Sequence, residues 1–418
     1  MIKKVEFEGI KYVDGGVCAA KGFKANGIQC GLAHAGASVT GKKNDLAVII
    51  ADCECSAAAV YTSNKVKGAP IAVTKKNIAD GKAWGAVVNS VNANTCNADG
   101  PEKAQKMCEL AAHEFGKNAS DFIVASTGVI GQPLPIEPIE KGMPELCKGV
   151  SYEGNAAAVE AIMTTDTQPK EVAVEFELGG KKCVVGGMLK GSGMIHPNMA
   201  TTLSFITTDA AIAPEYLKRA LCDNVKKTLN MVSVDGDQST NDMCCVLADG
   251  MAGNDVINSE NSDFEKFENA LYAVMLNLAR MMARDGEGAT KLIECVCTGA
   301  DSFETAKAVA KSVIMSSLFK AAIFGEDANW GRILCAVGYA DAEFDINQVD
   351  VDLVSDAGAI AVCRSGAGVE FSEEEAKKIL GEEEITVVVN IGIGGSRAVA
   401  WGCDLTYDYV KINGDYRS

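Results

Sequence analysis

The chain has 418 residues, of which 48% are hydrophobic and 23% charged, and its formal net charge is −17. This is the composition of an ordinary globular protein, and the length predicts two domains or lobes because single cores seldom grow so large. So acidic a surface repels nucleic acid and anionic membranes, and we expect neither as a partner.

The sequence has neither a run of about 18 apolar residues nor an N-terminal apolar core of signal-peptide length, so we expect a cytoplasmic protein. Its 16 cysteines are scattered without a C-x-x-C pair, and it has three histidines. This argues against a zinc site and a disulfide framework. We interpret most of the cysteines as small buried apolar residues in a reducing compartment.

In the first third of the chain, short apolar runs predict buried strands at 46–51, 58–61 and 84–89, and a helix is expected at 101–115. The run FIVA at 122–125 predicts another strand and leads into STGVIG. A strand that ends in a glycine turn presents backbone N–H groups, which can stabilise a developing alkoxide. The pattern alone describes an ordinary turn equally well.

The middle of the chain predicts a helix at 155–164, closed by TTDT, and then a hairpin over 172–189 with a Gly179-Gly180 turn. The segment KGSGMIHPNMATTLSFITTDA follows at 190–210, where a stretch rich in Gly, Pro and Asn interrupts the strand pattern. Such a break is typical of a surface loop.

The pair Ala200-Thr201, placed where the strand pattern resumes, suggests chemistry instead of a plain loop. The Thr201 hydroxyl can attack the Ala200 carbonyl, and water can cleave the ester that results. Thr201 would then begin a new chain whose α-amine lies beside its own hydroxyl. An N-terminal amine is a recognised base for a threonine nucleophile, and it titrates close to neutral pH.

In the second half, SVDGDQSTND lacks the spacing and closing Glu of a calcium loop. An apolar stripe predicts a helix over 262–283 with a capping box of Ser262 and Glu265, followed by DGEGAT. Helices at 214–229, 305–319 and 372–380 and strands at 292–298, 344–354, 359–363 and 385–390 complete the pattern. The later IGIGGS fails the spacing of a dinucleotide site.

Several segments together resemble one family. GSGMIHPNMATTLSFITTDA, VNSVNANTC near Val88 and the C-terminal NGDYRS stand in the order typical of the ornithine acetyltransferase (glutamate N-acetyltransferase) family of arginine biosynthesis. Members of that family cut themselves between Ala and Thr. The chain departs from the family pattern at Gln238 and Ala328, where Thr and Pro are usual, and at Ser418, where Thr is usual.

The resemblance implies a role for particular residues. Thr201 would be the nucleophile, Ala200-Thr201 the cleavage site, and Thr127 with Gly128 the oxyanion hole. The implied substrate contacts, besides Thr201 itself, are Thr164, Lys190, Glu287, Asn413 and Ser418. By charge, Lys190 suits a carboxylate and Glu287 an ammonium group. No metal and no organic cofactor are implied.

The implied fold is a layered α/β sandwich with mixed sheets, of the self-cleaving N-terminal-nucleophile type, with a smaller α/β lobe at about 300–390. Cleavage would give an α-subunit (1–200) and a β-subunit (201–418), with two copies of each in the assembly. The implied reaction transfers acetyl from N-acetylornithine to glutamate, and the use of acetyl-CoA as a further donor stays open.

Two alternatives remain at this point. An N-terminal-nucleophile aminopeptidase or amidohydrolase would share the self-cleavage but let water take the acyl group. A non-catalytic metabolite-binding protein would keep the Gly/Pro stretch as a loop and stay a single intact chain.

Overall fold

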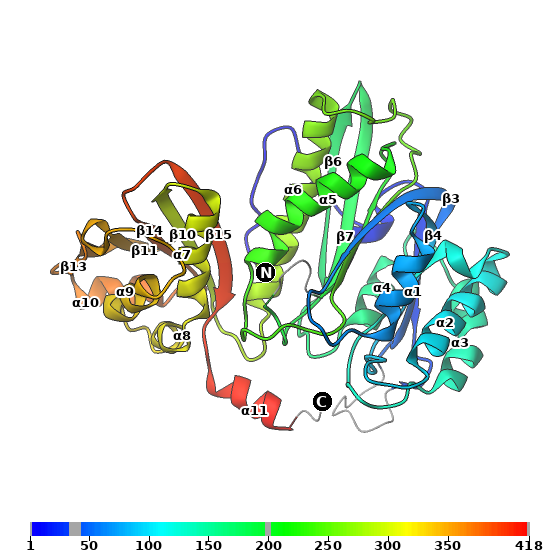
Figure 1. The fold of residues 1–418 in the computed structure, drawn as a ribbon, viewed down its shortest axis with the longest axis horizontal. Helices are drawn as coiled ribbons and strands as arrows, with labels where there is room; N and C mark the ends of the chain where they lie inside the picture. The colour runs from blue at the N-terminus through cyan, green and yellow to red at the C-terminus, as the bar shows by residue number, and fades with distance from the viewer. Residues whose placement is uncertain (1, 33–42, 197–201, 416–418) are drawn as a thin grey trace.

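The computed structural model describes residues 2–32, 43–196 and 202–415. Within these ranges the chain forms two mixed β-sheets with helices packed against them (Figure 1). The predicted fold class, layered α/β with mixed sheets, is confirmed. Every helix in the described ranges is too short or too polar to cross a membrane.

The larger sheet has the strand order β1-β6-β7-β8-β9-β3-β4-β5, and β2 pairs with β3 in addition. The pairs β4–β5 and β8–β9 are parallel, and the other pairs are antiparallel. Its strands are β1 (Lys11–Val13), β2 (Phe23–Ile28), β3 (Leu46–Tyr61), β4 (Lys82–Asn89), β5 (Phe122–Ser126), β6 (Lys170–Leu178), β7 (Lys181–Lys190), β8 (Leu203–Thr208) and β9 (Met243–Ala248).

Helices cover both faces of this sheet because its strands are apolar on both sides. Leu46, Val48 and Ile50 of β3 face a core shared with α2 and α3, whereas Ala47 and Ile49 face a core shared with α4. The helices of this part are α1 (Ala69–Asn77), α2 (Gly100–Phe115), α3 (Ile136–Lys148), α4 (Asn155–Ile162), α5 (Pro214–Lys227) and α6 (Ser262–Arg284).

The smaller sheet has the order β13-β12-β11-β14-β10-β15, in which β10 and β14 are parallel. Its strands are β10 (Leu292–Ala300), β11 (Asp350–Ser355), β12 (Gly358–Arg364), β13 (Ala367–Gly368), β14 (Glu384–Asn390) and β15 (Ser396–Cys403). The helices that accompany it are α7 (Phe303–Met315), α8 (Ser317–Phe324), α9 (Trp330–Gly338) and α10 (Glu373–Leu380).

Two helices connect the two parts of the molecule. The apolar residues of α6 belong to one continuous core with β6 and β7 of the larger sheet and β10 and β15 of the smaller one. After β15 the chain turns back, and α11 (Tyr407–Asp415) lies below the gap between the two sheets (Figure 1).

Four local predictions were wrong in detail. The strand expected at 344–354 begins only at Asp350, because Ile346–Gln348 form a short 3-10 helix. The runs at 46–51 and 58–61 form one strand, β3, whose pairing with β4 shifts register between Ile50 and Cys55. The cap of α6 is Asn261, whose side chain accepts from the Asp263 and Phe264 N–H groups, because Asn is itself a strong N-cap. The helix expected at 305–319 is broken at Ser316, which caps α8 by accepting from Phe319 N–H.

Candidate active site

The ends of three neighbouring strands bring the central segment to one edge of the larger sheet. Lys190, the last residue of β7, pairs with Leu203 at the start of β8, and Leu203 pairs in turn with Met243 at the start of β9. Lys190, Thr202 and Asp242 are therefore neighbours at this edge. Ala200 and Thr201, the predicted cleavage pair, lie outside the described residues.

Thr202 enters β8 in an unusual conformation that Asp242 supports. Its φ is 93°, a left-handed value that a β-branched residue seldom adopts. Its N–H donates to Asp242 Oδ1 at 2.6 Å, and Asp242 is 2% exposed. Burial raises the pKa of Asp242 to about 7, although the Thr202 N–H opposes the shift. A proton-exchanging carboxyl thus lies next to the residue that follows Thr201.

The turn after β5 requires a glycine. Gly128 has a φ of 132°, and a Cβ there would lie 2.1 Å from the carbonyl carbon of Val91. Thr127 N–H donates to Asn89 O at 3.0 Å, so the first turn residue continues the strand pairing. Neither the Gly128 N–H nor the Thr127 hydroxyl donates to any residue in the described ranges.

Asn241 joins this turn to the start of β9. Its amide Nδ2 donates to Ser126 O at 2.9 Å and to Ala93 O at 2.6 Å. Its Oδ1 accepts from the hydroxyls of Thr95 and Thr240, each at 2.6 Å. All four contacts are buried, so Asn241 fixes the turn at 126–128 relative to Asp242 and Thr202.

A small cavity lies where these elements meet. It collects two predicted site residues, Thr127 and Lys190, beside Thr202 and Asp242. The complete lining is Thr127, Lys190, Gly193, Met194, Ile195, Thr202, Leu203, Ser239, Asn241 and Asp242. The structure therefore brings an oxyanion-hole candidate and a cation to the residue that follows Thr201.

Glu287 and Asn413, both predicted substrate contacts, touch each other close to this cavity. Asn413 Nδ2 on α11 donates to Glu287 Oε2 at 2.7 Å. The Glu287 carboxyl also covers Gly193, where a Cβ would be only 2.3 Å from it. Gly193 lines the small cavity, so the Glu287 carboxyl packs against the wall of this cavity, and Asn413 is connected to the wall through Glu287. Ser418 lies outside the described residues.

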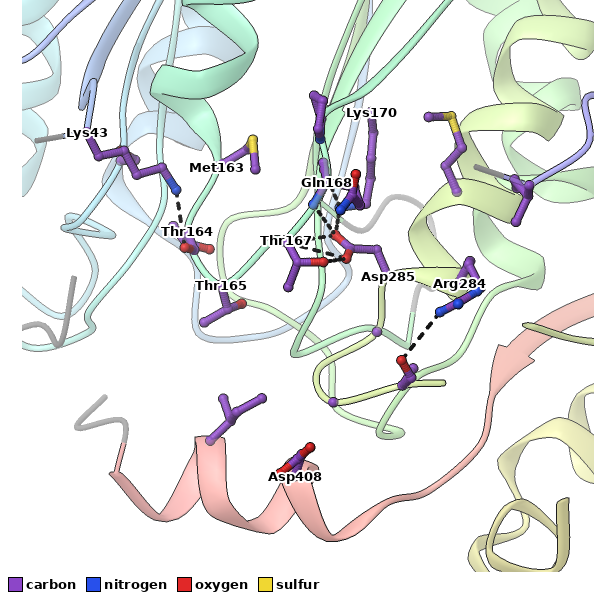
Figure 2. A pocket seen from close by; sticks show the side chains of 18 of the residues that line it. Lys43, Met163, Thr164, Thr165, Thr167, Gln168, Lys170, Arg284, Asp285 and Asp408 are labelled. Atoms are coloured by element: carbon purple, nitrogen blue, oxygen red, sulfur yellow. Dashed lines mark hydrogen bonds and ion pairs between the residues drawn. The ribbon is translucent and has the colours of Figure 1, made fainter. Parts of the chain in front are cut away.

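Thr164 lies on a second, larger cavity of about 1040 Å³, which is lined also by Gly286 and Gly288 on either side of Glu287. Figure 2 shows Thr164 between Lys43 and Thr165, across the cavity from Asp285. The Thr164 carbonyl accepts from Lys43 Nζ at 3.3 Å. Burial lowers the pKa of Lys43, in spite of nearby Asp166.

Sequence reasoning did not assign roles to Asn241, Asp242, Asp166 and Lys170. The signal for the first two is a polar pair directly before the apolar strand MCCVLA. Across the described residues, no group of three or more His, Cys, Asp or Glu side chains is arranged to hold a metal ion.

Comparison with known protein sequences shows which family the chain belongs to. The profile described as "ArgJ family" matches residues 25–418. The arginine biosynthesis bifunctional protein ArgJ 1 of Clostridium acetobutylicum is 49% identical over 397 residues, which are 95% of this chain and 96% of that protein. Arginine biosynthesis bifunctional protein ArgJ of Symbiobacterium thermophilum is 47% identical over 98% of this chain and all of its own length.

Among solved structures, ornithine acetyltransferase of Mycobacterium tuberculosis, complexed with ornithine, is 31% identical, with a TM-score of 0.41 over 46% of this chain and 100% of that chain. The profile match and the full-length relatives identify the chain as a member of the ArgJ family, an enzyme family of arginine biosynthesis with acyltransferase activity.

Proposed function

We propose that the enzyme transfers the acetyl group of N-acetylornithine to glutamate through an acetyl ester on Thr201, after cutting itself between Ala200 and Thr201. The observation that carries the proposal is the small cavity that Thr127, Lys190 and Thr202 share. Family membership supports it further, since the relatives are named as bifunctional proteins of arginine biosynthesis.

In the proposed first step, the Thr201 hydroxyl oxygen attacks the acetyl carbonyl carbon while the Thr201 α-amine takes the hydroxyl proton. The carbonyl oxygen becomes an oxyanion, for which the Gly128 N–H and the Thr127 hydroxyl are open donors. The C–N bond then breaks, and the proton passes to the departing amine of ornithine. Thr201 keeps the acetyl group as an ester.

In the second step, the amine of glutamate attacks the ester carbonyl at the same oxyanion donors. The C–O bond breaks, Thr201 recovers its proton and N-acetylglutamate leaves. Lys190 would hold the α-carboxylate of either substrate, and Glu287, oriented by Asn413, would hold an ammonium group. Thr164 and Ser418 complete the proposed amino-acid contacts.

The same proposal divides the protein into chains 1–200 and 201–418, with a smaller lobe at about 300–390 in the second chain. We propose that two copies of each chain form the assembly. The described strands support a lasting association of the two chains, because β7 and β8, on either side of the junction, pair over six residues.

A gel and a kinetic assay test the proposal. Wild-type protein should give two bands under denaturing conditions, the second beginning at Thr201, and Thr201→Ala should give one. Thr201→Ser is the matched control, since it keeps a hydroxyl and should still cleave. Active wild-type enzyme that stays a single chain would refute the cleavage.

For the transfer, initial rates with both substrates varied should give parallel lines, and mass spectrometry should find acetyl on the second chain. Intersecting lines without an acetylated chain would contradict the covalent step. Release of acetate at the same rate with or without glutamate would instead identify a hydrolase. Acetyl-CoA in place of N-acetylornithine shows whether the enzyme accepts a second donor.

A further inference from the structure

We propose that Lys170 is a positioning residue that, through buried ion pairs with Asp166 and Asp285, sets the geometry of the amino-acid binding site. The inference rests on the proposed function, because its readout is substrate binding. Lys170 is the first residue of β6, and its side chain points toward Asp285, beside Gln168 (Figure 2).

The three charged groups lie in the protein interior. Lys170 Nζ is 2.7 Å from Asp166 Oδ1 and 2.5 Å from Asp285 Oδ2. The exposed fractions of the three side chains are 1% for Lys170, 0% for Asp166 and 7% for Asp285. One ammonium group thus bridges two carboxylates, and the Asp285 carboxylate lies 115 residues along the chain from Lys170.

The Asp166 carboxylate holds two segments that carry predicted substrate contacts. It accepts from the Thr164 N–H at 3.0 Å and from the Gly191 N–H, directly after Lys190, at 2.8 Å. Burial alone would raise the pKa of Asp166, but the charges of Lys170 and Lys190 keep it well below its usual value. Asp166 therefore stays an acceptor for both amides.

The Asp285 carboxylate holds the third segment. It accepts from the N–H and the hydroxyl of Thr167 and from the Gln168 N–H. The main-chain carbonyl of Asp285 in turn accepts from Ser192 Oγ at 2.6 Å. The Glu287 N–H donates back to Ser192 O at 3.1 Å. Through Asp285 the network therefore reaches Glu287, the proposed ammonium contact.

Stability alone gives little reason for this arrangement. Removing three charged groups from water costs about as much as their attraction returns, and an apolar trio of similar volume is often as stable. A charged trio with directional bonds, however, fixes the angles between the loops that it joins. These are the segments that carry or adjoin Thr164, Lys190 and Glu287. Asp285 lies after the proposed cleavage point, whereas Asp166 and Lys170 lie before it.

Asp285→Asn tests the inference, because it removes one charge while keeping the size of the side chain. One carboxylate oxygen becomes an NH2 group, which cannot accept from Lys170 or from Thr167. We expect the KM for N-acetylornithine to rise at least about tenfold, with a smaller change in kcat, because binding geometry is lost and the nucleophile is untouched. Cleavage at Thr201 should continue.

Glu384→Gln is the matched control. Glu384, on β14 of the smaller sheet, pairs with Arg280 of α6 at 2.7 Å and does not line either cavity. Both variants neutralise one carboxylate of an ion pair, so both should lower Tm, but only Asp285→Asn should change KM when assayed well below Tm. Wild-type KM in Asp285→Asn, or an equal rise in both variants, would overturn the positioning role.

Thr167→Val provides an independent test if Asp285→Asn does not fold. Thr167 is exposed, and the change removes only its hydroxyl bond to Asp285. A smaller rise in KM supports the inference, and an unchanged KM counts against it. Wild-type enzyme that transfers no acetyl group would refute the proposed function itself, a result that is visible before any variant is compared.

Discussion

Asp242 is a buried acid directly before β9, and it titrates near neutral pH. Its carboxyl accepts from the Thr202 N–H, and the charges of Lys190 and Asp235 also influence its pKa. Burial is the largest influence, and it raises the pKa to about 7. The unfolded chain would have the usual value near 3.9. Between these two values the folded protein binds a proton that the unfolded chain has lost.

The sign of the resulting pH dependence follows from this difference. The contribution of Asp242 to stability is complete below about pH 4 and is lost as the pH rises through 7. Asp242→Asn does not titrate and keeps an oxygen for the Thr202 N–H. The unfolding free energy of Asp242→Asn should therefore rise relative to that of its Asp242 parent as the pH goes from 4 to 8. The total change in this difference should be at most about 4 kcal/mol.

The comparison is best made by urea unfolding in a Thr201→Ala background, where the chain stays in one piece. Asp249, whose pKa burial also raises to about 7, is present in both proteins and cancels in the difference. A difference between Asp242→Asn and its parent that is the same at every pH would show that the carboxyl is not perturbed.

The turn that follows β5 is the element on which the proposed oxyanion hole depends. Gly128→Ala would place a Cβ 2.1 Å from the Val91 carbonyl carbon and 2.5 Å from Asn92 N. The backbone would have to move, so we expect a loss of about 3 kcal/mol or more in unfolding free energy, together with a loss of kcat.

Gly131→Ala, in the same turn region, is the control for the backbone conformation alone. Its φ is 79°, but a Cβ there meets nothing within 4 Å. It should cost about 1 kcal/mol, the strain of a left-handed residue, and leave kcat unchanged. Equal effects of the two variants on urea unfolding and kcat would mean that the contact with Val91 is unimportant.

Local pattern predicted several elements well because their apolar residues repeat at the period of the element. The strand expected at 122–125 is β5, and the helix expected at 262–283 is α6. Helix α3 carries Pro144 in its interior, and a proline there ordinarily argues against a helix. Strand β3 continues through the polar stretch around Asp52, where no apolar pattern marks it.

The site was less predictable than the fold. A family resemblance, and no local pattern, pointed to Thr127, Lys190, Glu287 and Asn413. The structure adds that the first two line one cavity and that the last two are hydrogen-bonded to each other. Lys170 opens a strand, where a lysine is normally exposed. Its burial depends on Asp285, a partner 115 residues away, and no local pattern contains that information.

At the scale of the whole molecule, the proposed cleavage point separates strands that alternate within one sheet. Strands β8 and β9, which follow residue 201, stand between β7 on one side and β3 on the other, both of which precede it. They pair with β7 over six residues and with β3 over another six. Neither proposed chain can complete the larger sheet without the other.

This interleaved strand order would make unfolding irreversible in practice once the chain is cut. An intact chain closes the sheet in a unimolecular reaction, whereas two separate chains must first find each other. Dilution slows the second process and not the first, and each lone chain meanwhile exposes unpaired strand edges that favour aggregation. Cutting would therefore turn a protein that can refold into one that persists only while it stays folded.

The refolding yield should show this directly. After urea denaturation, Thr201→Ala should recover its native circular dichroism to the same extent at every protein concentration. Cleaved wild-type protein should recover less as it is diluted, and the protein that is not recovered should be present as separate chains that have not assembled. A cleaved protein whose recovery is independent of concentration would mean that each chain folds alone, and the shared sheet would then be a later assembly of two finished halves.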